Sequence, residues 1–156
     1  MIDVKIINSV LNSITGTFKT STKVDLKMGK PQLLKSIEGR YGIVTTIGFN
    51  GVLEGNIVYT FNQDVGLEIA NSMMGGMMDL NEMDEMAISA IGELGNMISG
   101  AVATNLEKIG YSINITPPSI VEGKAIKVSV DGSILKFSAF LKNEKEFDIY
   151  LVVKSK

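Results

Sequence analysis

The 156-residue chain contains no cysteine, no histidine and no tryptophan. Without cysteine it has neither a disulfide nor a thiol nucleophile, and without histidine it has no Ser–His pair and no imidazole base. Zinc and most transition metals also lose their usual protein ligands. Any chemistry must therefore use carboxylates, amides, hydroxyls, lysine or arginine, or act on groups that a partner supplies.

The chain also has neither a large net charge nor a long apolar run. The net charge is only −2, without a basic patch, which argues against a nucleic acid partner. No apolar run reaches the length of a membrane span, and the N-terminus lacks the charged n-region and apolar h-region of a signal peptide. We therefore expect a cytoplasmic protein without membrane insertion.

The apolar content is sufficient for a substantial core, since 45% of the residues are hydrophobic. The length suits one domain, and no linker rich in proline, serine or glycine divides the chain. Residues 1–156 are therefore predicted to form a single domain.

Hydrophobic periodicity predicts three helices in this chain. The first covers about residues 4–18 behind an N-cap at Asp3. The second starts at residues 62–64, is capped by Asp64, and ends at Gly75 and Gly76. The third and longest runs from 81 to 110, with Asn81 as its N-cap and Gly110 at its end.

The remaining apolar segments read as strands that form one mainly antiparallel sheet. They are residues 22–28, 41–49, 52–61, 111–115, 124–130, 134–141 and 147–153. Asn50-Gly51 and Asp131-Gly132 are hairpin signals between neighbouring strands. The order of helix, strands, two helices and strands predicts an α+β layer sandwich, with the sheet packed against long helices.

The predicted helix 81–110 carries a row of polar residues. At about 100° per residue, Ser89, Glu93 and Asn96 fall within an arc of about 60°. The opposite side is apolar and is expected to face the core through Ile91, Leu94, Ile98, Val102 and Ile109. The row is small or polar where a plain surface helix would carry lysine, glutamine or arginine.

Glycines interrupt the same helix at positions 92, 95 and 100. Each costs roughly 0.5–1 kcal/mol of helix stability relative to alanine, so something should compensate. Close approach of a partner's backbone is one explanation. Packing inside the same domain is the other, and the sequence leaves both open.

The spacing S-x-x-x-E-x-x-N from Ser89 to Asn96 resembles the signature of the CheC/CheX/FliY family of chemotaxis phosphatases. That signature continues to a proline, for which both Pro117 and Pro118 are available. The likeness includes the segments KMGKPQL, GFNGVLEGNIVYTF and MMGG, and covers nearly the whole chain. CheC-type members usually carry two such sites, whereas the first helix here lacks the glutamate, which favours the CheX branch.

The resemblance implies a function. The family removes the phosphoryl group from phosphorylated CheY, a response regulator that carries it on an aspartate. Glu93 and Asn96 would then be catalytic, and the residues implied to contact the partner are Ser89, Gly92, Gly100, Pro117 and Pro118. No metal or cofactor of the chain's own is expected, because the regulator already holds Mg²⁺.

Two other functions stay open at this stage. One is a non-catalytic adaptor that binds a response regulator or the flagellar switch. The other is a structural assembly subunit, in which the polar row on the long helix would be accidental.

The resemblance also implies a homodimer joined edge to edge through its sheets. Strands 41–49 and 147–153 are apolar runs with few charges, a profile seldom left exposed at an edge. Either strand is therefore central, or is paired with a second copy. The competing possibility is a monomer whose edges are shielded by loops and by the lysine-containing tail 154–156.

Overall fold

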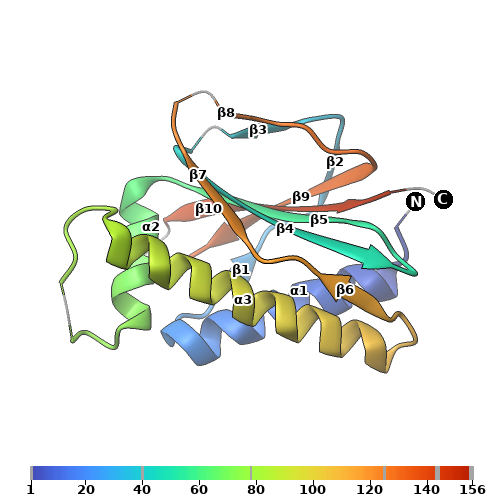
Figure 1. Ribbon diagram of the computed structural model, residues 1–156, viewed down its shortest axis with the longest axis horizontal. Coiled ribbons are helices and arrows are strands. Elements are labelled where there is room, and N and C mark those ends of the chain that lie inside the picture. The colour runs from blue at the N-terminus through green and yellow to red at the C-terminus, as the bar shows by residue number, and fades with distance from the viewer. Residues whose placement is uncertain (1, 40, 78, 125, 143–144, 155–156) are drawn as a thin grey trace.

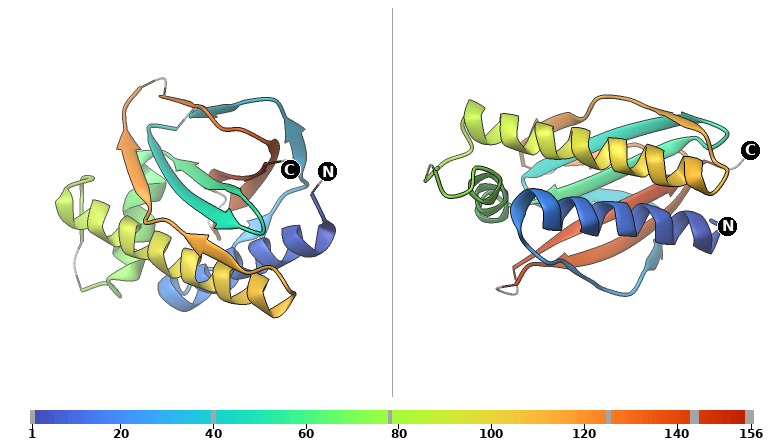
Figure 2. Two further views of the ribbon diagram at one scale, coloured as in Figure 1. Left: turned by 45° about the vertical axis from the view of Figure 1, so that its right-hand side comes forward. Right: turned by 90° about the horizontal axis from the view of Figure 1, so that it is seen from below.

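Helices cover one face of an antiparallel sheet in the computed structural model, which describes residues 2–39, 41–77, 79–124, 126–142 and 145–154. The helices are α1 (Val4–Thr22), α2 (Gln63–Met73) and α3 (Glu85–Lys108). Figure 1 shows α1 and α3 on the same side of the sheet, with α2 at one end. Seen from below in Figure 2, α1 and α3 lie side by side and run in opposite directions. The predicted α+β class is confirmed.

The main sheet, within the described residues, has the order β1-β9-β10-β5-β4-β6, with every pair antiparallel. Its central strands are β9 (Ser133–Phe140), β10 (Glu146–Val153), β5 (Gly55–Phe61) and β4 (Ile43–Gly51). Short strands cover the outer sides of β9 and β4: β1 (Lys27–Met28), β2 (Gln32–Leu34), β6 (Ile113–Ile115) and β7 (Ser119–Glu122). A separate pair is formed by β3 (Ile37–Gly39) and β8 (Ile126–Val128).

The sheet is buried on both faces. Along β10, Phe147, Ile149 and Leu151 pack in the core beneath the helices, whereas Tyr150 and Val152 belong to a second core. This second core includes side chains of β3 and β8, which lie on the other side of the sheet in Figure 1. Because successive residues of a strand point to opposite faces, covering both faces explains the continuous apolar run of β10.

The long helix begins later than the sequence suggested. Its N-cap is Asp84 rather than Asn81, and the Asp84 side chain accepts a hydrogen bond from the Ala87 N–H at 2.9 Å. At the other end Ile109 is the exposed C-cap, so its predicted place in the core is wrong. Leu106 is buried instead. An N-cap carboxylate three residues before a free N–H is the better acceptor for the first turn.

The first two helices show one correct and one incorrect cap. Asp3 caps α1 as predicted, with its side chain accepting from the Lys5 N–H at 2.9 Å. In α2 the N-cap is Asn62, whose side chain accepts from the Val65 N–H at 2.9 Å. Asp64 lies within the first turn instead, where its charge favours the positive end of the helix dipole.

Two predicted strands and one predicted hairpin turn changed. The helix α1 extends to Thr22, so the predicted strand 22–28 shrinks to β1. Asn50 and Gly51 lie at the end of β4 and pair with β6, so the β4–β5 hairpin loop begins two residues later than predicted, at 52–54. The predicted strand 124–130 is reduced to β8, and its residue 125 lies outside the described residues.

The second predicted hairpin is wrong. Gly132 does turn the chain, with a φ of +137°, but β8 pairs with β3 while β9 pairs with β10. Turn chemistry therefore identified the reversal of the chain, and the partner of each strand was decided by packing on the second core. Strands β2, β3 and β7 were not predicted because three or four residues are too few to show a period.

Both strands offered as dimer edges are internal. β10 lies between β9 and β5, and β4 is paired with β5 on one side and with β6 and β7 on the other. The edges of the described sheet are the short pieces β1 with β2, and β6 with β7. Of the predicted shielding tail, residues 155 and 156 lie outside the described residues.

One described helix, α3, is long and apolar enough to cross a membrane by length and composition alone. The sequence alone did not predict such a helix, because its apolar residues do not form one uninterrupted run. In this fold α3 packs against α1, α2 and the sheet, and its apolar side belongs to the core. The core helix of a globular protein passes the same length and composition test.

Candidate functional site

The site is built on the solvent-facing side of α3. Ser89, Glu93 and Asn96 are all exposed, as predicted for the polar row. Glu93 and Asn96 are one turn apart, about 4.5 Å along the helix axis. The structure therefore brings a carboxylate and a carboxamide together on one open face.

The opposite side of α3 fixes the direction of this row. Ile91, Leu94, Ile98 and Val102 are fully buried in the main core. Burying each such side chain contributes roughly 1.5–3 kcal/mol. Rotation of α3 about its axis would expose them, so Glu93 and Asn96 stay directed at solvent.

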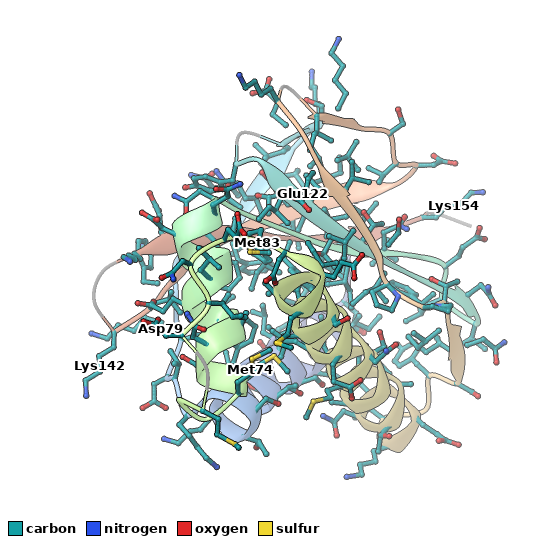
Figure 3. The ribbon with its side chains drawn as sticks, turned by 60° about the vertical axis from the view of Figure 1, so that its left-hand side comes forward. Met74, Asp79, Met83, Glu122, Lys142 and Lys154 are labelled. Atoms are coloured by element: carbon teal, nitrogen blue, oxygen red, sulfur yellow. The ribbon has the colours of Figure 1, made fainter. Side chains whose placement is uncertain are left out.

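The loop that leads into α3 is fastened to α2. The Asn71 side chain accepts from the Leu80 N–H at 2.8 Å and donates to the Leu80 carbonyl at 3.1 Å. Figure 3 shows Met83 between α2 and the start of α3, with Asp79 on the connecting loop. These contacts set where α3 begins and so where Ser89 lies.

The three glycines of α3 have different surroundings. A Cβ added at Gly100 would meet nothing within 4 Å, and one at Gly92 would meet only Ile120 Cδ1 at 3.8 Å. At Gly95 an added Cβ would lie 2.9 Å from the Pro118 Cβ and 2.9 Å from the Tyr59 hydroxyl. Gly95 therefore serves packing inside the domain, whereas Gly100 leaves bare backbone on the exposed face.

The two prolines are also distinct. Pro118 is half-buried and packs against α3 at Gly95, the residue before Asn96. Pro117 is exposed. Ser119, which follows Pro118, starts β7 and pairs with Thr46 of β4. Of the two prolines that the sequence left open, Pro118 is the one that contacts the turn carrying Asn96.

Exposed methionines lie beside the polar row, and the sequence analysis did not single them out. Met86 is 44% exposed and Met97 is 38% exposed. On the helical wheel both lie on the same side of Glu93, within about 40° of it. The Ser21 hydroxyl donates to the Met97 sulfur at 3.4 Å. The same helical wheel that found the row would have found this flank. The face thus combines polar groups with adaptable apolar contact area.

At its N-terminal end the row continues into a shallow hollow. Ser89 lines it together with Asp84, Glu85 and Met86. The two carboxylates make this end of the face acidic, which favours a cationic contact. Among the described residues, no group of three or more acidic side chains is arranged to hold a metal ion.

Tyr59 lies behind the site and was not predicted to matter. Its side chain is 1% exposed, and its hydroxyl has no hydrogen-bond partner in the described structure. Burial raises the pKa of Tyr59 far above its ordinary value, because the phenolate form would lose its hydration. The hydroxyl is therefore neutral at all physiological pH values.

Residues 43–142 match the family described as chemotaxis phosphatase CheX. The chain is 40% identical over 153 residues to the CheY-P phosphatase CheX of Thermotoga maritima, covering 98% of both chains. It is also similar to solved structures. A CheC-like superfamily protein from Shewanella sp. PV-4 is 28% identical with a TM-score of 0.86, and covers 99% of this chain and 100% of its own.

A second solved structure is informative because of what it contains. It is the complex of CheX with CheY, BeF₃ and Mg²⁺ from Borrelia burgdorferi. This chain is 26% identical to the matched protein, with a TM-score of 0.82, over 99% of this chain and 100% of that one.

Proposed function

The chain belongs to the chemotaxis phosphatase CheX family, and we propose that Glu93 and Asn96 carry out its hydrolysis of the aspartyl phosphate of a CheY-like response regulator. The observation that supports this assignment is the exposed row on α3. It places a carboxylate and a carboxamide one turn apart on a helix whose other side is locked in the core. The chain is thus a hydrolase of phosphorylated CheY, with a site that is a surface rather than a pocket.

The reaction requires positioning more than acid–base chemistry. Water attacks the phosphorus in line, a new P–O bond forms, and the bond from phosphorus to the aspartate oxygen breaks. The products are inorganic phosphate and the free carboxylate. An acyl phosphate has a good leaving group, so a strong base is not needed, which suits a chain without histidine.

Asn96 is assigned to the attacking water. Its carboxamide oxygen accepts a hydrogen bond from the water, and its NH₂ group donates to a phosphoryl oxygen. Holding both in line converts an encounter of water and phosphate into an oriented reaction. The buried side of α3 supplies the rigidity for this task.

Glu93 is assigned to a cation of the regulator. By resemblance to the family, it contacts the lysine of the regulator's active site. A carboxylate on an acidic, exposed face can draw that lysine toward α3 and align the two proteins. Ser89 shapes the contact rather than reacting, because the chain has no histidine base to activate its hydroxyl.

Gly92 and Gly100 are assigned to the contact itself. A helix face without side chains at these positions lets the regulator approach the backbone of α3. Pro118 contributes through its packing on α3, whereas the exposed Pro117 is available for the partner. The chain needs no cofactor of its own in this proposal, because Mg²⁺ belongs to the regulator.

We also propose that the protein is a cytoplasmic homodimer. The edge made by β1 and β2 is the favoured interface, since Leu33 of β2 is 75% exposed. The other edge, β6 with β7, contacts α3 beside the polar row. Joining the β1–β2 edges leaves both rows free and gives two independent sites per dimer.

A phosphate-release assay tests the proposed function. CheY phosphorylated by a small acyl phosphate is mixed with the wild-type chain, and the decay of phosphorylated CheY is compared with its decay alone. Faster decay supports the phosphatase. Binding to CheY activated with BeF₃, without faster decay, would show the adaptor instead. If the chain neither binds CheY nor speeds the decay, the structural subunit is the remaining function.

A further inference from the structure

Gly95 lies between Glu93 and Asn96 and packs closely against the rest of the domain. A Cβ at this residue would lie 2.9 Å from the Pro118 Cβ, 3.1 Å from the Pro118 Cγ and 2.9 Å from the Tyr59 hydroxyl. Contacts below 3.0 Å require something to move. At Gly95, the residue before Asn96, α3 therefore lies directly against these two residues.

Pro118 and Tyr59, which contact the helix at Gly95, are both fixed by the sheet. The Pro118 ring is rigid, and the next residue begins β7, where Ser119 pairs with Thr46. Tyr59 belongs to β5, is 1% exposed, and stacks on Phe61 with ring centroids 6.1 Å apart. The contact thus connects one turn of α3 to β5 and to the residue that precedes β7.

The same turn is held from within the helix. The buried Ser99 hydroxyl donates to the Gly95 carbonyl at 2.8 Å. Such a bond from serine to the carbonyl four residues back often bends a helix. Gly95 therefore has Pro118 and Tyr59 against the side where a Cβ would stand, and its carbonyl accepts a hydrogen bond from Ser99.

We propose that Gly95, Pro118 and Tyr59 form a positioning contact that sets the place of the Asn96 carboxamide relative to the phosphoryl group. The proposal rests on the phosphatase function assigned above. These residues do not touch the reacting atoms, and they act through the backbone of Asn96. A displacement of about 1 Å in such a group lowers a rate by roughly 100-fold, so this contact is worth maintaining at the cost of a helix glycine.

Simple packing is the competing explanation, and it predicts a different result. If the contact only stabilised the fold, a perturbing substitution would lower the melting temperature and leave the turnover of folded molecules unchanged. A positioning contact instead lowers kcat for phosphorylated CheY, while the affinity for CheY activated with BeF₃ stays near the wild-type value. The split between turnover and affinity separates the two.

The experiment compares Gly95→Ala with Gly16→Ala. Gly16 is a glycine of α1 at which an added Cβ meets nothing within 4 Å, so its variant controls for helix propensity. We expect Gly95→Ala to lower kcat by roughly 10- to 100-fold with its affinity retained, and Gly16→Ala to match wild type. Circular dichroism melting sets the folded fraction of each variant.

A second variant decides the case in which Gly95→Ala does not fold. Pro118→Ala removes Cγ and Cδ of the ring and loosens the same contact without adding a heavy atom, and it should lower kcat in the same way. An active wild type whose folded variants keep the kcat of Gly16→Ala would overturn this inference alone, as would the failure of both variants to fold. A wild type without phosphatase activity would overturn the proposed function and this inference together.

Discussion

At the residue scale, Glu93 and Asn96 share one feature, which is a fixed backbone beneath a free side chain. The backbone is held by Leu94 and Ile98 in the core, while both polar groups face solvent. This division suits a group that must be ready for a partner and must not reorganise when the partner arrives.

Reversing the charge of Glu93 tests its contact with the regulator. Glu93→Lys places a like charge against the regulator's lysine, so we expect kcat/KM to fall at least about tenfold, equal to about 1.4 kcal/mol. Phosphate release and binding titrations measure it, and the effect should weaken with added salt.

The matched control is Glu107→Lys, an exposed glutamate near the same line of α3 but about 21 Å further along the axis. If kcat/KM falls equally in the two variants, Glu93 makes no specific contact with the regulator and acts only through the overall charge of the helix.

Tyr59 gives a prediction about pH and stability. A buried hydroxyl without a hydrogen bond costs about 1–3 kcal/mol, so Tyr59→Phe should leave the free energy of unfolding unchanged or higher. Because burial raises the folded-state pKa, the tyrosine's contribution is constant below its unfolded pKa of about 10. Above that pH the unfolded state ionises first and stability falls.

Urea titrations between neutral pH and about pH 11 check this expectation, with the loss at high pH smaller in Tyr59→Phe than in wild type. Parallel curves for the two proteins would show that the Tyr59 hydroxyl ionises as freely in the folded state as in the unfolded state.

The exposed residues of the site could be predicted from the sequence, whereas the residues that support them from the sheet could not. Ser89, Glu93 and Asn96 were found because a period and a family signature both act within one helix. Tyr59 and Pro118 meet Gly95 only through the pairing of β5, β4 and β7, and a single sequence carries no record of that pairing. The exposed flank of Met86 and Met97 was available from the same period and was overlooked.

At the scale of elements, α3 both packs on the sheet and presents an open outer face, and different glycines serve these two roles. Gly95 lets the helix settle on the sheet, and Gly100 leaves its outer face open. The cost in helix propensity noted from the sequence is therefore offset inside the domain at Gly95. At Gly100 nothing in the described structure offsets it, which is expected of a surface that awaits a partner.

Gly100→Ala separates fold stability from binding. Its Cβ meets nothing within 4 Å, so we expect the free energy of unfolding to rise by roughly 0.5–1 kcal/mol. The same methyl group would intrude between α3 and the regulator, and the affinity for CheY activated with BeF₃ should fall. Chemical unfolding and calorimetric titration measure the two effects. A stabilised variant with wild-type affinity would remove Gly100 from the interface.

Elements were predicted well where a pattern is long, and poorly where tertiary pairing decides. All three helices and the strands around β4, β5, β9 and β10 were found, because each shows several turns or alternations. The caps shifted to Asp84 and Asn62 because several acceptors compete within a few residues. The Asp131-Gly132 turn leads to another layer, since β8 completes a second core with β3.

At the scale of the whole molecule, the position of the edges determines how copies can join. The β1–β2 edge and the β6–β7 edge are at opposite ends of the described strand order. A dimer through the first leaves α3 free, whereas a dimer through the second brings the partner copy toward the row on α3.

Light scattering with two edge variants tests the dimer. The wild type should have twice the mass of one 16.8 kDa chain, and Leu33→Lys should dissociate it by placing a charge on the edge. Val121→Lys, at a 48% exposed position of β7, is the matched control and should remain a dimer. One chain's mass for wild type at every micromolar concentration would rule the dimer out. Dissociation by Val121→Lys alone would move the interface to β7.

We propose that Asn96 on α3 promotes hydrolysis of an aspartyl phosphate. The most direct test is the decay of phosphorylated CheY under single-turnover conditions, with wild type, Asn96→Ala and Asn8→Ala, an exposed asparagine of α1 that serves as control. We expect Asn96→Ala to fold, to bind CheY activated with BeF₃, and to give no acceleration above the decay of CheY alone, while Asn8→Ala equals wild type. An Asn96→Ala protein that accelerates the decay as fast as wild type would contradict it.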